Sequence, residues 1–128
     1  MKRRIVLTRS TLSGVFDERR KCVVRLEPAY IETLDDPAAD GAATGFERNV
    51  ILELYDPGPH AVLLELPAPI TTSLLTVEEQ RHVDCVPLPM VTGGSTQLRI
   101  ETQAGETLTL RGRGVAAIFH GRRSFEEE

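Results

Sequence analysis

The stretch TQLRIETQAGETLTLRGRGVAAIFHG, residues 96–121, decides the fold that the sequence predicts. Apolar and polar residues alternate on both sides of a short break at 103–105, and a period of two is typical of strands with one buried and one exposed face. Gly105 falls at the third position of this loop, where the common three-residue hairpin needs a left-handed backbone. The same loop places the apolar residues on one face in two facing pairs, which are Ile100 with Leu108 and Leu98 with Leu110.

A third strand is expected directly after this hairpin. Gly112 and Gly114 permit another reversal of the chain, and residues 115–119 are all apolar, as in a strand that is covered on both faces. Residues 96–121 are therefore predicted to form a three-stranded antiparallel meander and to be the folding core.

The rest of the chain predicts further strands and at most one short helix. Residues 71–82 hold the helical candidate, because Thr76 and Glu79 have the spacing of a capping box. Residues 49–67 are expected to form a second hairpin with a proline- and glycine-containing turn. We predict an all-β fold of about eight antiparallel strands in a sandwich or a partly open barrel. The other expected strands are 4–8, 21–27 with Cys22, Val24 and Leu26 facing inward, 30–34 as an edge strand, and 85–90, also at a sheet edge.

Length and composition predict one β domain, residues 1–128, with a mobile loop at 35–46 and a frayed tail at 122–128. Tryptophan is absent and aromatic residues make up only 5% of the chain, so the core must be aliphatic. The formal net charge of −4 argues against a general nucleic-acid-binding protein. The apolar run near the start is too short for a signal peptide, and no run is long enough to span a membrane.

The two cysteines, Cys22 and Cys85, lie in separate predicted strands. We expect both to be reduced, buried thiols, because disulfides are rare in proteins that are not exported. The sequence therefore predicts a cytoplasmic protein, and it predicts no cofactor.

One local cluster could carry chemistry. In an extended strand His82 and Asp84 share one face, where the carboxylate could orient the imidazole or both could hold a metal. A metal site needs three or four ligands, and only His60 and His120 remain to supply imidazole. The favoured interpretation is that His82 and Asp84 are surface residues beside a buried Cys85. A ligand or metal site made of His82, Asp84 and His120 is the alternative.

A second candidate is a basic strand face formed by Arg99, Arg111 and Arg113. Sheets that bind nucleic acids combine such arginines with exposed aromatic residues that stack on bases. No aromatic residue alternates with these arginines, and Glu101 shares their face. We therefore interpret them as solvated charges, and single-stranded nucleic-acid binding remains the weaker alternative.

Several predicted strands carry apolar residues on both faces. In the 49–67 hairpin, Ile51, Tyr55 and Leu63 point away from the residues expected to face the core. One short helix cannot cover two sheets, so either the sheet closes on itself as a barrel or a second copy or another protein covers these side chains. A homo-oligomer or a complex with a protein partner is predicted.

The sequence contains no device that would identify an enzyme. It lacks a glycine-rich phosphate loop with a lysine, a nucleophile elbow and paired CxxC motifs. The predicted function is a small non-catalytic cytoplasmic module that binds or assembles and that self-associates. The alternative from another class is a β-barrel that binds a small ligand or acts as an enzyme through His82 and Asp84.

Overall fold

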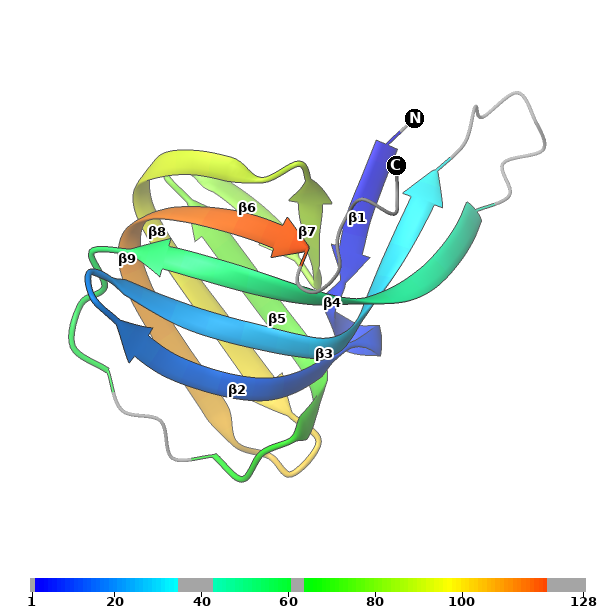
Figure 1. Ribbon diagram of the computed structural model, residues 1–128, viewed down its shortest axis with the longest axis horizontal. Helices are drawn as coiled ribbons and strands as arrows, with labels where there is room; N and C mark the ends of the chain where they lie inside the picture. Colours follow the sequence, from blue (N-terminus) through cyan, green and yellow to red (C-terminus); the bar gives the residue numbers. More distant parts are fainter. Residues whose placement is uncertain (1, 35–42, 61–63, 120–128) are drawn as a thin grey trace.

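The computed structural model describes residues 2–34, 43–60 and 64–119, and strands make up most of them (Figure 1). These residues contain no α-helix, only the short 3-10 turn η1 (Leu7–Arg9), so the all-β prediction is confirmed. The strands are β1 (Lys2–Val6), β2 (Thr11–Glu18), β3 (Lys21–Leu34), β4 (Ala43–Tyr55), β5 (Ala68–Val77), β6 (Gln80–Val83), β7 (Cys85–Leu88), β8 (Val91–Thr102) and β9 (Thr107–Phe119).

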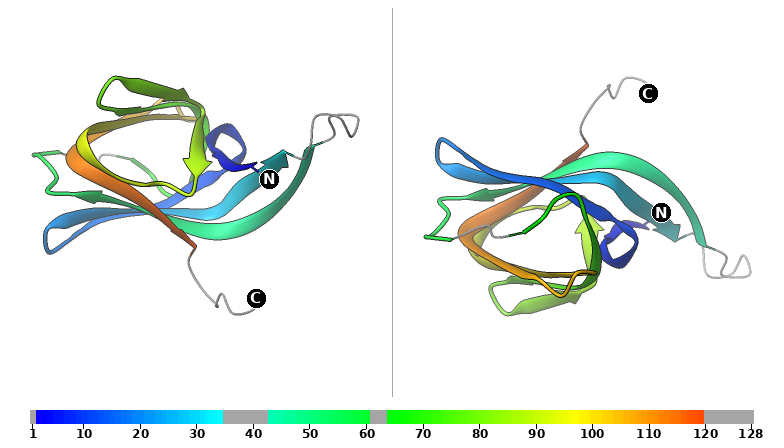
Figure 2. Two further views of the ribbon diagram at one scale, coloured as in Figure 1. Left: turned by 90° about the horizontal axis from the view of Figure 1, so that it is seen from above. Right: turned by 90° about the horizontal axis from the view of Figure 1, so that it is seen from below.

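Six of the strands close into a barrel. They follow each other in the order β2-β5-β8-β9-β4-β3, and the pairing of β2 with β3 completes the ring. All pairings are antiparallel, and β1 and then β7 continue the sheet from β3, while β6 pairs with β5. Figure 2 shows the barrel from one end, with the last part of β3 and the first part of β4 projecting beyond it. Closure satisfies the hydrogen-bonding edges of the ring strands, which an open sheet would leave exposed.

The hairpin predicted from residues 96–121 is confirmed in its register. Ile100 pairs with Leu108, and Leu98 pairs with Leu110 across β8 and β9. Gly105 has a φ of +84° and its amide donates to the carbonyl of Thr102 at 2.9 Å. Local alternation and turn chemistry therefore suffice to determine this part of the fold.

The predicted third strand of the meander is wrong as a separate element. Gly112 and Gly114 do not reverse the chain, and β9 runs without a break from Thr107 to Phe119. Its second half pairs with β4, from Leu54 opposite Val115 onward. A Cβ at Gly112 would lie 2.7 Å from the backbone oxygen of Tyr55, so glycine permits this close approach of the two strands.

The predicted helix over residues 71–82 is also wrong. These residues form most of β5, a turn at Glu78 and Glu79, and most of β6. Ser73, Leu75 and Val77 are buried with a period of two, which is the pattern of a strand. The Glu78 carboxylate in this turn accepts a 2.7 Å hydrogen bond from the Ser95 amide of β8.

The second predicted hairpin, residues 49–67, fails because both sides of β4 are already occupied. One side of β4 pairs with β3 and the other with β9, so no edge remains for residues 60–67. Among the described residues that follow β4, 56–60 and 64–67 are not in strands. Leu64 and Leu66 are partly buried against the core, so this segment covers the barrel instead of extending the sheet.

Smaller corrections concern the ends of the predicted elements. Strand β3 does not end at Pro28 but continues to Leu34 through a register shift, and this part lies between β1 and β4 instead of at an edge. Residues 43–46 belong to β4, whereas 35–42 and the predicted frayed tail lie outside the described residues. The strand expected at 85–90 is confirmed as β7, which ends the sheet.

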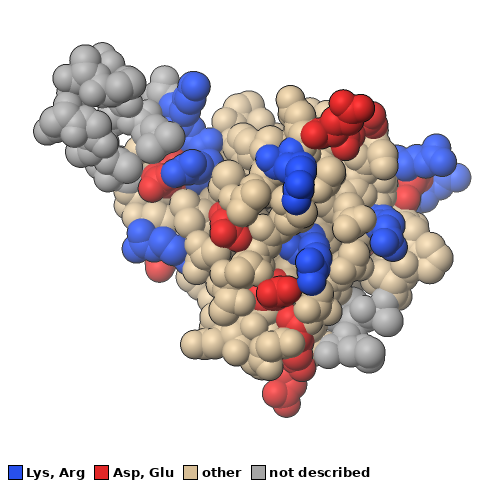
Figure 3. All heavy atoms as spheres, turned by 180° about the vertical axis from the view of Figure 1, so that it is seen from behind, with Lys and Arg blue, Asp and Glu red and all other residues tan. Residues whose placement is uncertain are grey.

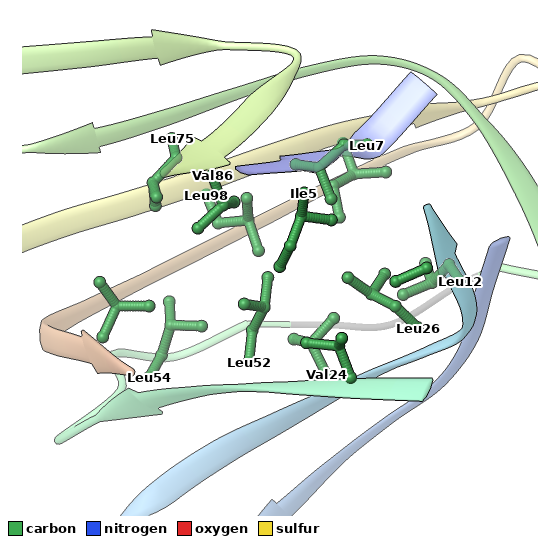
Figure 4. Packing of buried hydrophobic residues seen from close by; sticks show 14 of the residues in the cluster. Ile5, Leu7, Leu12, Val24, Leu26, Leu52, Leu54, Leu75, Val86 and Leu98 are labelled. Atoms are coloured by element: carbon green, nitrogen blue, oxygen red, sulfur yellow. The ribbon is translucent and has the colours of Figure 1, made fainter. Parts of the chain in front are cut away.

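The barrel interior is an aliphatic core, as the composition requires. Side chains of β1, β5, β7 and β8 face those of β3 and β4 across it (Figure 4). The largest fully buried side chains are all leucine or isoleucine, and they include Ile5, Leu26, Leu52, Leu75, Ile100 and Leu110.

The core predicts a clear contrast between neighbouring residues of β8. Ile100 is fully buried, and Ile100→Ala is expected to lower the free energy of unfolding by about 2–5 kcal/mol. Arg99 is exposed and lies 3.1 Å from the Glu101 carboxylate. Arg99→Ala is expected to change the free energy by less than about 0.5 kcal/mol. Urea denaturation measures both, and equal losses would contradict the register.

Candidate metal centre

Three side chains with metal-binding atoms meet at one end of the barrel. Asp17 of β2 lies directly opposite Cys22 of β3, and both follow the inward-facing rows of their strands. His60 comes from the segment after β4. Its Nε2 atom is 3.2 Å from Asp17 Oδ1 and 3.9 Å from Cys22 Sγ. No other group of three or more histidine, cysteine or acidic side chains could hold a metal within 2–34, 43–60 and 64–119.

The segment that carries His60 is fixed to two neighbouring elements. Asp56 breaks β4 with a φ of +46°, and Pro57 and Pro59 cannot continue a sheet ladder. The Asp56 amide donates to the carbonyl of Arg20 in the β2–β3 turn at 2.8 Å, and the Gly58 amide donates to the carbonyl of Arg111 in β9 at 3.0 Å. These bonds position His60 above the pair formed by Asp17 and Cys22.

The separations are close to those of a tetrahedral zinc site. Usual zinc bond lengths give distances of about 3.3 Å between nitrogen and oxygen ligands and about 3.6 Å between sulfur and nitrogen ligands. The observed values are 3.2 Å and 3.9 Å, and all three ligand atoms lie within 4.8 Å of one another. The two distances from His60 therefore differ from these values by a few tenths of an ångström or less.

The orientation of the His60 ring also suits a metal ligand. Its Nδ1 atom lies 3.1 Å from the carbonyl oxygen of Gly58, which can only accept a hydrogen bond. With the proton on Nδ1, the lone pair of Nε2 points toward Asp17 and Cys22. Metal-binding histidines almost always donate their second ring N–H in this way, to a carbonyl or a carboxylate. The side chain of His60 is only 9% exposed, whereas that of Asp17 is 67% exposed.

The thiol of Cys22 is protonated at neutral pH. Burial, and to a smaller extent the nearby Asp17 carboxylate, raise its pKa to about 11. A thiol in this state is a poor nucleophile, which argues against covalent catalysis by Cys22. A bound metal ion would reverse the situation, because a coordinating thiol loses its proton.

The cluster opens to solvent on one side. Asp17 and His60 line a groove of about 530 Å³, together with Arg19, Arg20 and residues 56–59. Cys22 is fully buried and does not line the groove, so it forms the inner side of the cluster. An ion held by the three side chains would therefore be reached from the groove.

In the structure, Asp84 bonds to backbone amides of neighbouring elements instead of orienting the His82 ring or holding a metal. Its carboxylate accepts a 2.7 Å hydrogen bond from the amide of Ser73, and its carbonyl accepts one from the amide of Leu7 at 3.0 Å. Asp84 thus links the β6–β7 connection to β5 and η1, and His82 lies on β6 opposite Leu75. His120 lies outside the described residues.

The two cysteines are both free thiols, as expected, but they differ in burial. Cys22 is in the core, whereas Cys85 is half-buried at the start of β7 instead of fully buried.

The register of β8 and β9 places Arg99 and Arg111 on the same outer face, one diagonal step apart, but their side chains contact different neighbours. Arg99 pairs with Glu101, and Arg111 donates from Nε to Gln97 at 3.3 Å. Arg111 and Arg113 line a polar hollow of about 960 Å³ that Arg99 does not reach. Figure 3 shows basic and acidic side chains interspersed on the face that it presents.

The residues predicted for self-association are placed only in part. Ile51 and Tyr55 are half-buried in β4, and Leu63 lies outside the described residues. The Tyr55 hydroxyl donates to Glu53 at 2.9 Å, and Glu53 also pairs with Lys21 at 2.8 Å. The Lys21 ammonium group is accordingly the main cause that lowers the pKa of Glu53.

Sequence reasoning missed the cluster because its members looked unrelated. Cys22 is expected to face inward, but nothing in the sequence relates it to Asp17, in the charged run at 17–20, or to His60. The two-residue turn at Arg19 and Arg20 was the available signal, since it sets Asp17 opposite Cys22. Nothing local predicts that His60 reaches them, because that contact depends on where the segment after β4 crosses the barrel.

No helix among the described residues has the length and apolar character to cross a membrane. No family model, no curated protein and no solved structure matches this chain.

Proposed function

We propose that the protein is a β-barrel module that binds a divalent metal ion of the zinc class through Asp17, Cys22 and His60. One observation carries the proposal, namely the convergence of three different donor atoms around a histidine whose other nitrogen is held by the Gly58 carbonyl. Three protein ligands leave the fourth position of a tetrahedral ion for water or for a bound ligand. The adjoining groove gives a ligand access to that position.

The donor set favours zinc over the hard divalent cations. Thiolate and imidazole are ligands that Zn²⁺ prefers, whereas Mg²⁺ and Ca²⁺ are bound through oxygen atoms. A thiolate at Cys22 and a carboxylate at Asp17 would together balance the charge of a divalent ion.

An ion pair between His60 and Asp17 is the simplest alternative for the same geometry. When the ring is protonated, the 3.2 Å contact needs no metal. That pair would form equally well with an apolar side chain at position 22. The sulfur atom 3.9 Å from the same ring nitrogen adds a third donor, which an ion pair does not require.

The zinc content of the purified protein tests the proposal. Equilibrium dialysis against micromolar Zn²⁺ followed by elemental analysis is expected to find one ion per chain. His82→Ala is the matched control, because His82 lies on β6 outside the cluster and its loss should leave the stoichiometry unchanged. Wild-type protein that retains no zinc under these conditions would contradict the proposal.

The compartment and the type of activity are part of the same proposal. Two free thiols fit a reducing environment, so we place the module in the cytoplasm. We assign it a binding role, because the sequence carries no phosphate loop with a lysine, no nucleophile elbow and no paired CxxC motif.

Self-association is a second proposal, and an exposed apolar patch on the outer face of the barrel supports it. Phe16 is 40% exposed and Ile118 is 42% exposed. Ile51, which is half-buried, lies directly opposite Ile118 on β4, whereas Val23, opposite Phe16 on β3, is only 3% exposed. The closed barrel buries the inner faces of its strands, so this outer patch is the surface that a second copy would cover.

Ile118→Glu is expected to convert a self-associated wild-type protein into a monomer, because it places a charge within the patch. Light scattering coupled to gel filtration measures the change. Thr107→Glu, at an exposed position near the other end of β9, is the control and should not alter the mass. A wild-type protein that is monomeric at high concentration would rule out self-association.

A further inference from the structure

A second pocket lies where β9 ends beside β7 and β1. Its volume is about 270 Å³, and its lining residues are Leu88, Pro89, Ala117, Phe119 and Arg3. Four of these five are apolar, and Arg3 supplies the single charge. The volume is just below the usual range of sites for drug-sized ligands, so it suits a short chain or a single ring.

Arg3 lines this pocket, and a second arginine, Arg48, stacks on the lining residue Phe119. The guanidinium carbon of Arg48 lies 4.6 Å from the ring centre of Phe119, and that of Arg3 lies 5.8 Å from the ring centre of Phe46. Arg48 and Phe46 follow Val50 on β4 with a period of two, and Val50 pairs with Phe119. Both arginine–aromatic pairs therefore continue the inner face of the barrel beyond the ring.

No carboxylate among the described residues lies within 4.0 Å of Arg3 or Arg48. The contrast with Arg4 is clear, because Arg4 forms an ion pair with Glu32 at 2.6 Å on the same strand pair. A stacked guanidinium uses its flat face and keeps N–H groups at its edge for a planar anion. Stacking also restricts the side chain in advance, which reduces the entropy lost when a ligand binds.

We propose that this pocket binds a small carboxylate with an apolar body, with the carboxylate on Arg48 and Arg3 and the body against Phe119, Ala117 and Leu88. The proposal does not depend on the metal centre. Cys22 lies at the start of β3, whereas β1, which carries Arg3, pairs with the other end of β3 near Leu34. Charge-assisted bonds to arginine provide the specificity for the acid.

Calorimetry with octanoate tests the proposal on metal-free protein, so that the acid cannot bind a metal instead. Octanoate is expected to bind at millimolar or lower concentration, and octanamide, which has the same chain without the charge, at least about tenfold more weakly. Arg48→Gln is expected to weaken octanoate binding about tenfold to a hundredfold. Arg81→Gln, at an exposed position on β6, is the matched control and should bind normally.

A second variant tests the pocket without altering its charge. Ala117→Leu fills space beside Phe119 and is expected to abolish octanoate binding, while a thermal melt confirms that the barrel still folds. Three results would each overturn the proposal. The first is that wild-type protein does not bind octanoate at millimolar concentration. The second is that it binds octanoate and octanamide equally. The third is that Arg48→Gln binds octanoate as tightly as the wild type does.

Discussion

Replacing His60 by alanine is expected to weaken Zn²⁺ binding by about two orders of magnitude. Four-ligand structural zinc sites contribute roughly 10–16 kcal/mol, which is about 3 kcal/mol or more for each ligand. The Nε2 atom of His60 lies 3.2 Å from the Asp17 oxygen and 3.9 Å from the Cys22 sulfur, so it is placed to share an ion with both. Competition with a chromophoric chelator measures the affinity of the wild type and of the variant.

The loss of zinc affinity on replacing each of the other two ligands should depend on the burial and charge of that ligand. Cys22→Ser is expected to cost at least as much as His60→Ala, because a buried thiolate is the strongest donor of the set. Asp17→Asn should cost less, since Asp17 is mostly exposed and water can take the vacated position. His82→Ala should change nothing. An affinity that is unaffected by His60→Ala would show that zinc binds elsewhere.

The zinc affinity is also expected to rise about tenfold for each unit of pH, and thus about a hundredfold over two units. The cause is the Cys22 thiol, whose pKa is raised to about 11 by burial and by Asp17. Below that pH the thiol carries a proton that must leave before the sulfur can coordinate, so raising the pH favours binding. The direction would be the opposite for a site that had to gain a proton.

Chelator competition between pH 7.5 and pH 9.5 measures this slope. Cys22→Ser is the control, because it removes the thiol proton from the reaction and should flatten the dependence. A wild-type affinity that is constant over this range would mean that Cys22 is not a ligand.

The parts of the fold that the sequence predicted correctly are local. The hairpin of β8 and β9 was predictable because alternation, loop length and Gly105 all agree within one short stretch. Closure of the barrel was not, because it depends on β2 pairing with both β3 and β5, which are far apart in the chain. The predicted fold therefore left sandwich and barrel undecided.

The errors arose where one pattern fits two structures. The alternation of Leu64 and Leu66 is as compatible with a segment that covers a barrel as with a strand, and only the occupied sides of β4 decide between them. Thr76 and Glu79 matched a capping box, yet the buried alternation of Ser73, Leu75 and Val77 prevailed because it places apolar surface in the core. Tertiary packing overrode a local signal in both cases.

Only part of the candidate metal centre could be predicted from the sequence. The facing of Asp17 and Cys22 follows from a two-residue turn, which the charged run before Cys22 indicated without fixing its length. The approach of His60 follows from two backbone hydrogen bonds, from Asp56 to Arg20 and from Gly58 to Arg111, that no sequence pattern reveals. The site is therefore a property of the closed barrel and not of a motif.

Titration of the protein with Co²⁺ tests the central claim most directly, because the spectrum reports the ligands as well as the binding. Wild-type protein is expected to show the strong visible bands of a four-coordinate ion and a thiolate-to-cobalt charge-transfer band, both complete at one ion per chain. The charge-transfer band should vanish in Cys22→Ser and persist in His82→Ala. A wild-type spectrum with only the weak bands of a six-coordinate ion, or without the charge-transfer band, would contradict a metal centre built on Asp17, Cys22 and His60.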